Sequence, residues 1–223
     1  LPDFTSFIRA TLYSFAGPAR DDYLRSATSV RTMKHEQLAL FQPQSMPAGF
    51  RYAPDLIDAD EEARLVAAFA DLPFKEFAFH GFLGKRRVVS FGFRYDFNGG
   101  GLTEAEPIPP FLLPARERAA AFVGLTPDRL QHVLITEYRP GAAIGWHRDR
   151  ANFGDVIGVS LVSPCTFRMR RRRGTGWERA AMRLDRRSVY LMRGPSRDEW
   201  EHSIPAVDEL RYSITFRSMR EKA

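Results

Sequence analysis

The stretch from Ile135 to Asp149, which reads ITEYRPGAAIGWHRD, constrains the possible folds of this chain more than any other. An apolar, strand-like segment is followed by a turn at Pro140-Gly141 and then by a His-x-Asp pair. His147 and Asp149 are two residues apart, so on an extended segment their side chains point the same way. One strand can therefore present an imidazole and a carboxylate together, and further partners must come from distant parts of the chain.

His202, in the segment WEHSIP, is the best placed second imidazole. Two histidines and one carboxylate on one face of a metal hold ferrous iron in many oxygenases, and they leave positions open for a cosubstrate and dioxygen. The His-x-Asp pair by itself is weak evidence, because roughly one chain in a few of this size contains one by composition. A structural, hydrogen-bonded role for these three residues is therefore the competing interpretation.

The closing segment RYSITFR supplies one polar face and one apolar face. On a strand, one face carries Arg211, Ser213, Thr215 and Arg217, and the other carries Tyr212, Ile214 and Phe216. Arginines on an inward face need anions, since a buried unpaired charge is very costly. A dicarboxylate meets this need, because guanidinium groups bind carboxylates bidentately. The competing interpretation pairs both arginines with carboxylates of the chain at the surface.

Taken together, the segments YRPG, HRD and RYSITFR, with His202 between the last two, resemble the AlkB family of iron(II)- and 2-oxoglutarate-dependent dioxygenases. The resemblance covers most of Gly49 to Met219, and the arginine-bounded final segment is its most specific part. It implies that the protein uses Fe(II), 2-oxoglutarate and O2. Thr136 and Ser213 depart from the pattern, because the best-known members carry Asn at both positions.

The resemblance also implies a role for each matched residue. It implies that the iron ligands, which are also the catalytic residues, are His147, Asp149 and His202. It places Arg211 against the distal carboxylate of 2-oxoglutarate and Arg217 near the metal-binding end of that molecule. Tyr138 matches a tyrosine that hydrogen-bonds the cosubstrate, and Ser213 lies in the same binding region.

The rest of the chain predicts a mainly β, α+β domain with two helices in its N-terminal half. Asp58 and Glu61 form a capping-box pattern before an apolar stripe, and a second helix is predicted from Pro114 to Val123, with Gly124 after it. This pattern suits a double-stranded β-helix, or jelly roll, with helices buttressing one sheet, and the resemblance implies the same fold. We expect the domain to span residues 49–219, after an N-terminal extension or connector of residues 1–48.

The composition is that of one well-cored domain, with 44% hydrophobic residues among 223. The 33 basic and 27 acidic residues give a net charge of +6, which permits an anionic partner without requiring one. Cys165 is the only cysteine, so no disulfide forms within the chain, which favours a reducing compartment such as the cytoplasm. No apolar run is long enough to span a membrane, and we expect a monomer.

A strand predicted over residues 86–97 is a candidate wall of the substrate site. Its alternation places the following residues on one face: Arg87, Val89, Phe91, Phe93, Tyr95 and Phe97. In AlkB-like enzymes the corresponding region helps to form a lid over the substrate base. We therefore predict that Arg87, Phe91, Phe93 and Tyr95 contact the substrate, the rings by stacking on a base. Packing of these rings in the core is the alternative.

An arginine-rich hairpin is the second candidate for substrate contacts. Residues 166–173 read TFRMRRRR, a Gly-Thr-Gly turn follows, and residues 181–184 return. Arg168, Arg170 and Arg172 project from one face, and we predict that Arg168 and Arg170 contact phosphates of the substrate. The alternative is that these charges guard an edge strand against association with another sheet.

The combined expectation is an oxidoreductase that demethylates N-alkylated bases in single-stranded DNA or RNA, as in DNA repair, and releases formaldehyde, succinate and CO2. Target bases in such substrates are reached unpaired or by flipping. One alternative is the same oxygenase chemistry on a protein side chain or a small metabolite, because a fold does not fix a substrate. Another is a non-enzymatic, arginine-rich nucleic-acid-binding protein in which the histidines are structural.

The residues before Met33 are expected to be dispensable for the chemistry. Residues 5–15 show helical spacing of apolar side chains, but Met33 opens the segment MKHEQLALF, which is typical of a bacterial start. A protein that starts at Met33 should bind iron(II) and 2-oxoglutarate as tightly as the full chain, as measured by isothermal titration calorimetry. Loss of either affinity would show that the extension contributes to the site.

Overall fold

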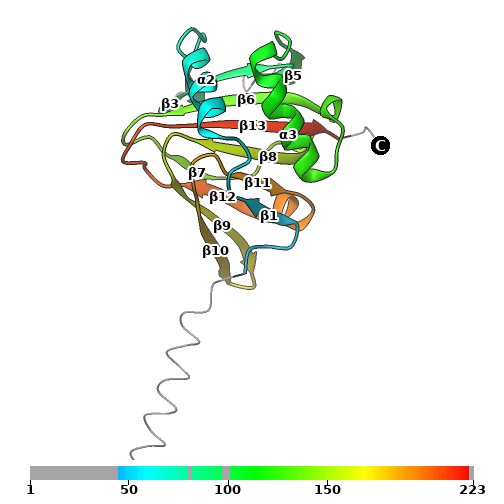
Figure 1. Ribbon diagram of the computed structural model, residues 1–223. Coiled ribbons are helices and arrows are strands. Elements are labelled where there is room, and N and C mark those ends of the chain that lie inside the picture. Colours follow the sequence, from blue (N-terminus) through cyan, green and yellow to red (C-terminus); the bar gives the residue numbers. More distant parts are fainter. Residues whose placement is uncertain (1–44, 80–81, 97–100, 221–223) are drawn as a thin grey trace, which may run out of the picture. The chain divides into compact units, whose positions relative to one another are not determined.

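The computed structural model describes residues 45–79, 82–96 and 101–220 (Figure 1), which belong to the unit Gln44–Ala223. Its strands are β1 (Phe50–Ala53), β2 (Lys75–Phe79), β3 (Phe82–Phe91), β4 (Phe93–Asp96), β5 (Gly101–Glu104), β6 (Leu130–Tyr138), β7 (Ile144–His147), β8 (Phe153–Leu161), β9 (Cys165–Arg173), β10 (Gly176–Leu184), β11 (Val189–Met192), β12 (Glu201–Ile204) and β13 (Arg211–Met219). Its helices are α2 (Ala59–Phe69), α3 (Leu113–Val123) and α4 (Pro195–Asp198), with 3-10 turns η1 (Pro110–Leu112) and η2 (Pro127–Arg129).

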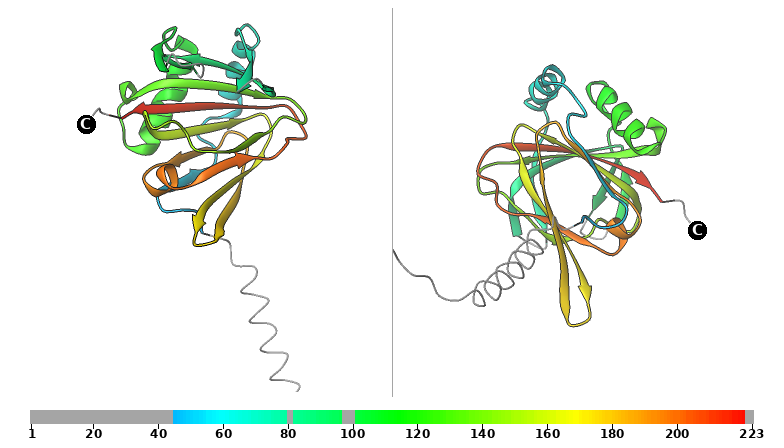
Figure 2. Two further views of the ribbon diagram at one scale, coloured as in Figure 1. Left: turned by 180° about the vertical axis from the view of Figure 1, so that it is seen from behind. Right: turned by 60° about the horizontal axis from the view of Figure 1, so that its bottom comes forward.

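Two antiparallel sheets enclose the interior of this unit. The seven-stranded sheet has the order β1-β11-β8-β13-β6-β3-β2, and the four-stranded sheet has the order β10-β9-β12-β7. In the right-hand view of Figure 2, the strands of both sheets are arranged around a common interior. Neighbouring strands come from distant parts of the sequence, as when β1 pairs with β11. The predicted mainly β jelly roll is therefore confirmed.

Helices α2 and α3 cover the outer face of the seven-stranded sheet (Figure 1). The side chain of Asp58 accepts a hydrogen bond from the backbone N–H of Glu61 at 2.7 Å, so the predicted cap begins α2. Gly124 ends α3 in the left-handed region, with a φ of 72°. The two helices predicted after Asp58 and from Pro114 to Val123 are thus confirmed in type and place.

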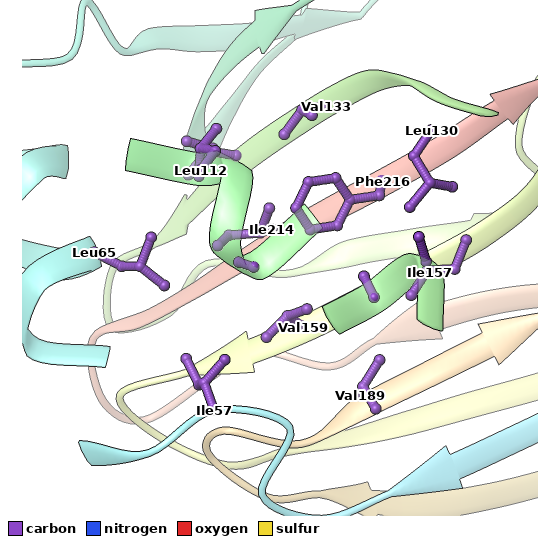
Figure 3. Close-up of a cluster of buried hydrophobic side chains, with 14 of the residues drawn as sticks. Ile57, Leu65, Leu112, Leu130, Val133, Ile157, Val159, Val189, Ile214 and Phe216 are labelled. Atoms are coloured by element: carbon purple, nitrogen blue, oxygen red, sulfur yellow. The ribbon is translucent and has the colours of Figure 1, made fainter. Parts of the chain in front are cut away.

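The larger apolar core lies between these helices and the seven-stranded sheet. Figure 3 shows Leu65 of α2 and Leu112 of η1 beside apolar side chains of the sheet, among them Ile214 and Phe216 of β13. Leu112, Ile214 and Phe216 are completely buried. Because strands alternate, the other side chains of β13 point to the interior between the two sheets. The helix-facing side supplies the core, and the inward side is available for polar residues.

A second apolar cluster occupies part of the interior between the sheets. Phe167 and Met169 of β9 and Leu184 of β10 are completely buried in it. Tyr190 of β11 belongs to the same cluster, and its ring stacks on that of Phe50 with centroids 6.0 Å apart. The polar inward residues of β13 therefore have apolar neighbours inside the fold.

The strand predicted over residues 86–97 is interrupted, so the prediction of one continuous strand was wrong. β3 ends at Phe91, Gly92 has a φ of 78°, and β4 pairs with β5 in a separate two-stranded sheet. A Cβ on Gly92 would lie 2.0 Å from the carbonyl oxygen of Gln131, so only glycine fits there. Residues 97–100, which include the end of the predicted strand, lie outside the described residues.

β9 is an interior strand of its sheet. It lies between β10 and β12, and the two edges of the four-stranded sheet are β10 and β7. Every residue of β9 pairs with a residue of β10, which confirms the predicted hairpin. The explanation of its arginines as guards of a sheet edge is therefore wrong.

Two other predictions concern residues that the structure does not describe. The helix predicted over residues 5–15 and the start at Met33 both lie outside the described residues. Within the ranges that the structure describes, no helix is long and apolar enough to cross a membrane.

Replacing Gly92 by alanine should destabilise the fold far more than the same change at Gly124. Both glycines have positive φ, which costs a residue with a side chain about 1 kcal/mol or more. Only at Gly92 does the added methyl group meet backbone atoms, whereas nothing lies within 4 Å of it at Gly124. Urea unfolding of Gly92→Ala and Gly124→Ala measures both losses. Equal losses would contradict the close approach of Gly92 to Gln131.

Candidate functional site

One cavity between the two sheets gathers the residues that the sequence singles out. Its empty volume, which includes open solvent at the mouth, is about 430 Å³. Its lining consists of Leu134, Thr136, Tyr138, Ile144, His147, Asp149, Val156, Phe167, Tyr190, His202, Ile204, Arg211, Ser213, Thr215 and Arg217. All residues that the resemblance matched to iron or cosubstrate are therefore in one place.

An extra residue in β7 turns His147 into this cavity. Ile144 pairs with Ile204 and His147 pairs with His202. Residues 144–147 of β7 therefore lie opposite residues 202–204 of β12, so β7 contains one extra residue. This β-bulge lets Ile144 and His147 both line the cavity, although they are three residues apart. β7 ends at His147, so Asp149 lies beyond the strand. The expectation that one strand presents His147 and Asp149 together was wrong, although both side chains reach the cavity.

The two histidines and Asp149 are neighbours. The ring centroids of His147 and His202 are 4.2 Å apart, and Nε2 of His202 is 3.6 Å from Oδ2 of Asp149. Nδ1 of His147 lies 2.9 Å from the carbonyl oxygen of Gly145, a contact that orients the ring. Oδ1 of Asp149 accepts a hydrogen bond from Nε of Arg217 at 2.8 Å, whereas Oδ2 is buried without a hydrogen-bond partner. One carboxylate oxygen is therefore available to a ligand.

Burial and charge hold these groups in the protonation states that a metal requires. Burial lowers the pKa of His202 to about 3, and it also lowers the pKa of His147. Burial alone would raise the pKa of Asp149, but the Arg217 guanidinium holds that pKa well below its usual value. Near neutral pH both imidazoles are therefore uncharged and the carboxylate is ionised.

The donor set fits ferrous iron in its chemistry, although the cage is not preformed. No three His, Cys, Asp or Glu side chains in the described part of the chain are already arranged to hold a metal ion. Atoms bound to one metal at about 2.1 Å lie roughly 3 Å apart, compared with 3.6 Å between His202 and Asp149. Two neutral imidazoles and one carboxylate are the ligands of iron oxygenases. Metal binding would therefore draw these side chains slightly closer together.

Arg211 is buried on the inward face of β13. Its side chain is 1% exposed, its Nη2 donates to Oγ of Ser160 at 3.1 Å, and its guanidinium lies over the ring of Tyr138. Nε and Nη1 are buried without a hydrogen-bond partner, and no described carboxylate pairs with Arg211. A buried cation in this state is costly unless an anion completes its pairing. Pairing of Arg211 at the surface was therefore the wrong alternative.

Arg217 connects Asp149 to His132. Its Nε and Nη2 lie 2.8 and 2.7 Å from Oδ1 of Asp149, and its Nη1 lies 3.3 Å from Nδ1 of His132. Burial lowers the pKa of His132 well below its ordinary value, so this ring is neutral and one of its nitrogens can accept a hydrogen bond. Arg217 thus pairs with a carboxylate of the chain, but it does so inside the cavity and not at the surface.

Arg197, which the sequence analysis did not identify, donates hydrogen bonds to the loop after Asp149 and fixes its position. Its buried side chain donates from Nη2 to the carbonyl oxygens of Arg150 and Phe153, at 2.6 and 3.0 Å. The residue lies in the single turn of α4, where no periodic pattern marks an inward side chain. This anchor holds the segment that carries Asp149, although the segment is not part of a strand.

Tyr190 is a second residue of the cavity that sequence reasoning missed. It pairs with Gly158 of β8, where a Cβ would lie 2.2 Å from the tyrosine ring and 2.6 Å from its hydroxyl oxygen. The ring therefore crosses β8 over Gly158 and lines the cavity. Burial raises the pKa of Tyr190, so its hydroxyl stays protonated and can donate. A glycine inside an apolar strand was the available signal, since it often marks such an approach.

Two substrate candidates on β3 face away from the cavity. Arg87 pairs in register with Glu137, and Phe91 pairs with Val133, on the helix-facing side of β6. Nη2 of Arg87 lies 2.7 Å from Oε2 of Glu137, and Phe91 belongs to the larger core. The predicted choice of face is therefore corrected, because the register with β6 directs the other set of β3 side chains inward. For Phe91 the core alternative holds.

The remaining candidates of this region are not brought together. Phe93, which is half-buried, and Tyr95 belong to β4, beyond the turn at Gly92. The side chain of Tyr95 lies outside the described residues. Arg86, which was not predicted, pairs in register with Tyr138 and so shares the cavity side of the sheet. Burial lowers the pKa of Arg86, and Tyr138 opposes that shift.

Arg168 and Arg170 lie on the outer face of the four-stranded sheet. Phe167 and Met169, their neighbours on β9, are completely buried, so the alternate side chains point outward. Nε of Arg168 donates to Oγ of Ser203 at 3.1 Å, and Nε of Arg170 lies 2.6 Å from a carboxylate oxygen of Glu201. The two arginines are therefore separated from the cavity by the sheet itself.

The metal-free protein should lose stability as the pH falls below 6.5. His202 has a folded pKa of about 3, and its unfolded value is near 6.5, so the unfolded state takes up the proton first. This linkage lowers the free energy of unfolding by about 2 kcal/mol at pH 5 relative to pH 7. Asp149, with its depressed pKa, adds a loss only at lower pH. Urea unfolding of His202→Gln at both pH values should show a decrease smaller by about 2 kcal/mol. An identical decrease would contradict a buried neutral His202.

Known proteins are similar to this chain in sequence and in fold. The chain is 27% identical over 199 residues to the alkylated DNA repair protein ALKBH8 homolog of Arabidopsis thaliana, a match covering 77% of this chain and 56% of that protein. It is 25% identical over 173 residues to the tRNA (carboxymethyluridine(34)-5-O)-methyltransferase ALKBH8 of Macaca fascicularis, covering 73% of this chain and 25% of that protein. The chain thus spans about half of the first relative's length and a quarter of the second's.

A solved structure and a family model complete the comparison. The structure of OsALKBH1 matches with a TM-score of 0.58 at 15% identity, over 78% of this chain and 100% of that chain, a likeness that concerns the fold alone. The family model described as the 2OG-Fe(II) oxygenase superfamily matches residues 49–217, which include the whole cavity lining. The chain therefore belongs to the 2OG-Fe(II) oxygenase superfamily, which uses iron(II), 2-oxoglutarate and O2, and it is similar in sequence to the AlkB-like members of that superfamily.

Proposed function

We propose that residues 49–219 form the catalytic domain of an enzyme that oxidatively demethylates N-alkylated bases in DNA or RNA, releasing formaldehyde, succinate and CO2. In this proposal His147, Asp149 and His202 hold the iron, and Arg211 binds the distal carboxylate of 2-oxoglutarate. Residues 1–48 are an extension outside the catalytic domain, and the enzyme acts as a monomer.

The buried, incompletely paired charge of Arg211 is the observation that carries this proposal. Two of its donors have no partner, and they belong to the cavity that also contains two imidazoles and Asp149. A dicarboxylate such as 2-oxoglutarate can satisfy the guanidinium with one end. Oδ2 of Asp149, buried and also without a partner, is a matching oxygen donor for the metal. An anion beside Arg211 and a cation beside Oδ2 of Asp149 would complete these contacts, and 2-oxoglutarate and iron(II) carry those charges.

The other cavity residues position these groups. Tyr138, whose ring centroid is 4.9 Å from the guanidinium carbon of Arg211, and Ser213 offer hydroxyl groups to the cosubstrate. Arg217 orients Asp149 and places positive charge near the metal-binding end of 2-oxoglutarate. Iron(II), 2-oxoglutarate and O2 supply the oxidising chemistry when bound. The enclosing sheets keep solvent from the buried ligands, and the mouth admits the target group.

Nucleic acid is the substrate class with the most support. One relative is named an alkylated DNA repair protein, and the other is named for a reaction on tRNA. The net charge of +6 favours a polyanion. Arg168 and Arg170 stand on an outer face that backbone phosphates can reach. In this proposal a methylated base enters the cavity unpaired or flipped out of its stack.

A protein side chain or a small metabolite is the alternative target, because neither the fold nor the cosubstrate determines the substrate. That alternative keeps the same ligands for iron and 2-oxoglutarate. The match to a superfamily of oxygenases argues against the non-enzymatic alternative. Stimulation of turnover by a methylated nucleic acid separates the two remaining choices.

Succinate release tests the proposal directly. The protein is supplied with iron(II), 2-oxoglutarate and O2, and with a single-stranded oligonucleotide that carries an N-methylated base or with its unmethylated twin. We expect faster succinate release with the methylated strand, and formaldehyde in step with it. Equal release with both strands would assign the enzyme to the alternative substrates. No release from folded, iron-loaded protein would overturn the proposed chemistry.

Variants assign the residues within the same assay. Asp149→Ala should abolish succinate release, because it removes the only carboxylate ligand. Arg211→Gln should raise the KM for 2-oxoglutarate roughly tenfold to a hundredfold, the value of one or two charge-assisted hydrogen bonds. Arg64→Gln, an exposed position on α2, is the matched control and should leave both values unchanged. Normal succinate production by Asp149→Ala would contradict the metal assignment.

A further inference from the structure

The outer face of the four-stranded sheet carries a cluster of cations and aromatic rings that the chemistry in the cavity does not use. Phe167 of β9 and Ala180 of β10 are buried inward residues, so their neighbours along each strand point outward. The outward residues are Arg168, Arg170 and Arg172 of β9, Trp177, Arg179 and Arg183 of β10, Trp146 of β7 and Glu201 of β12. We call this set the basic sheet face.

The basic sheet face concentrates positive charge. It carries five arginines, and the acidic residues beside them are Glu201, which pairs with Arg170, and Asp185, which pairs with Arg183 at the end of β10. The whole chain has a net charge of +6, so this one face accounts for half of the excess. The pair of Arg183 and Asp185 is exposed to solvent and therefore weak, and Arg179 forms no ion pair with the residues that the structure describes. The face thus suits a polyanionic partner.

Two tryptophans hold the arginines of β9 in place. The guanidinium of Arg170 lies 4.1 Å from the ring centroid of Trp177 and 4.4 Å from that of Trp146. Arg172 lies 4.5 Å from the Trp177 centroid, and Arg168 lies 5.2 Å from the Trp146 centroid. Stacking fixes the plane of a guanidinium while its N–H edge remains available to acceptors. The face is therefore a preordered row of hydrogen-bond donors.

The basic sheet face reaches the border of the candidate site. Trp146 contacts the outward arginines, whereas His147, the next residue, lines the cavity because of the bulge in β7. β7 is also one of the two edge strands of the sheet. Figure 1 shows α2 and α3 over the other sheet, and Figure 2 shows the β9–β10 hairpin extending away from them. A polymer lying on this face can therefore pass the edge beside His147.

We propose that the basic sheet face binds the sugar–phosphate backbone of the single-stranded nucleic acid whose base enters the cavity. The inference rests on the proposed function and adds a binding surface separate from the chemistry. Backbone phosphates pair with Arg172, Arg179 and Arg183, which are exposed. Aromatic rings beside such cations are typical of surfaces that bind single strands, since a base stacked inside a duplex offers no free ring face. The sheet face supplies affinity, and the cavity selects the modified base.

A fluorescence titration of the full chain tests this inference. Trp146 and Trp177 are two of the three tryptophans, and the third, Trp200, is buried at 4% exposure. A short single-stranded oligonucleotide, as RNA or as DNA, should therefore quench the tryptophan emission. The slope of log affinity against log salt should become shallower by about 2 in the triple variant Arg172→Gln, Arg179→Gln and Arg183→Gln. Each phosphate contact to a single strand contributes about 0.7 to that slope.

Controls separate this inference from the proposed function. Arg64→Gln, on helix α2, should keep the wild-type salt slope, and the thermal unfolding midpoint verifies the fold of each variant. An unchanged slope in the triple variant, with methylated strands still stimulating succinate release, would overturn the surface and leave the proposed function standing. Binding of phosphatidylserine vesicles but of no oligonucleotide would overturn the nucleic-acid assignment. Failure of every oligonucleotide to bind or to stimulate turnover would overturn both proposals.

Discussion

The burial of two guanidinium groups on the inward face of β13 is the constraint on which the rest of the structure depends. β13 is the central strand of the seven-stranded sheet, and Arg211 and Arg217 are only 1% and 8% exposed. Arg217 is compensated from within the chain by Asp149, whereas Arg211 meets no described carboxylate and contacts the hydroxyl of Ser160, the ring of Tyr138 and the side chain of Cys165. Such charges cannot stand in an apolar core. The interior between the sheets is therefore a polar cavity lined on one side by apolar residues.

Much of this arrangement could be predicted because it depends on local patterns. The two-residue alternation of β13 separates Arg211 and Arg217 from Ile214 and Phe216, and the structure places the first pair in the cavity and the second in the core. Helix caps are equally local, which is why the start of α2 and the end of α3 were predicted correctly. The jelly roll and the cofactors were implied by the family resemblance, because no periodicity brings His202 beside His147.

The features that could not be predicted depend on how strands pair. Alternation shows that Arg86 and Arg87 point to opposite faces, but only the register with β6 decides which face is the cavity. The bulge that re-aims His147 becomes visible only when β7 is aligned with β12. Likewise, the place of Tyr190 depends on a glycine in the neighbouring strand. The substrate candidates were the weakest part of the sequence analysis because each required knowledge of such a pairing.

The ion pair between Arg217 and Asp149 limits the number of oxygens through which this carboxylate could bind a metal. Because Arg217 occupies Oδ1, only Oδ2 remains for a metal. A carboxylate that binds through one oxygen takes a single coordination position, whereas a chelating one takes two. The ion pair would thus leave more of the metal open to the cosubstrate and to dioxygen. In this sense an arginine that never touches the metal would determine how many other molecules can bind to it at once.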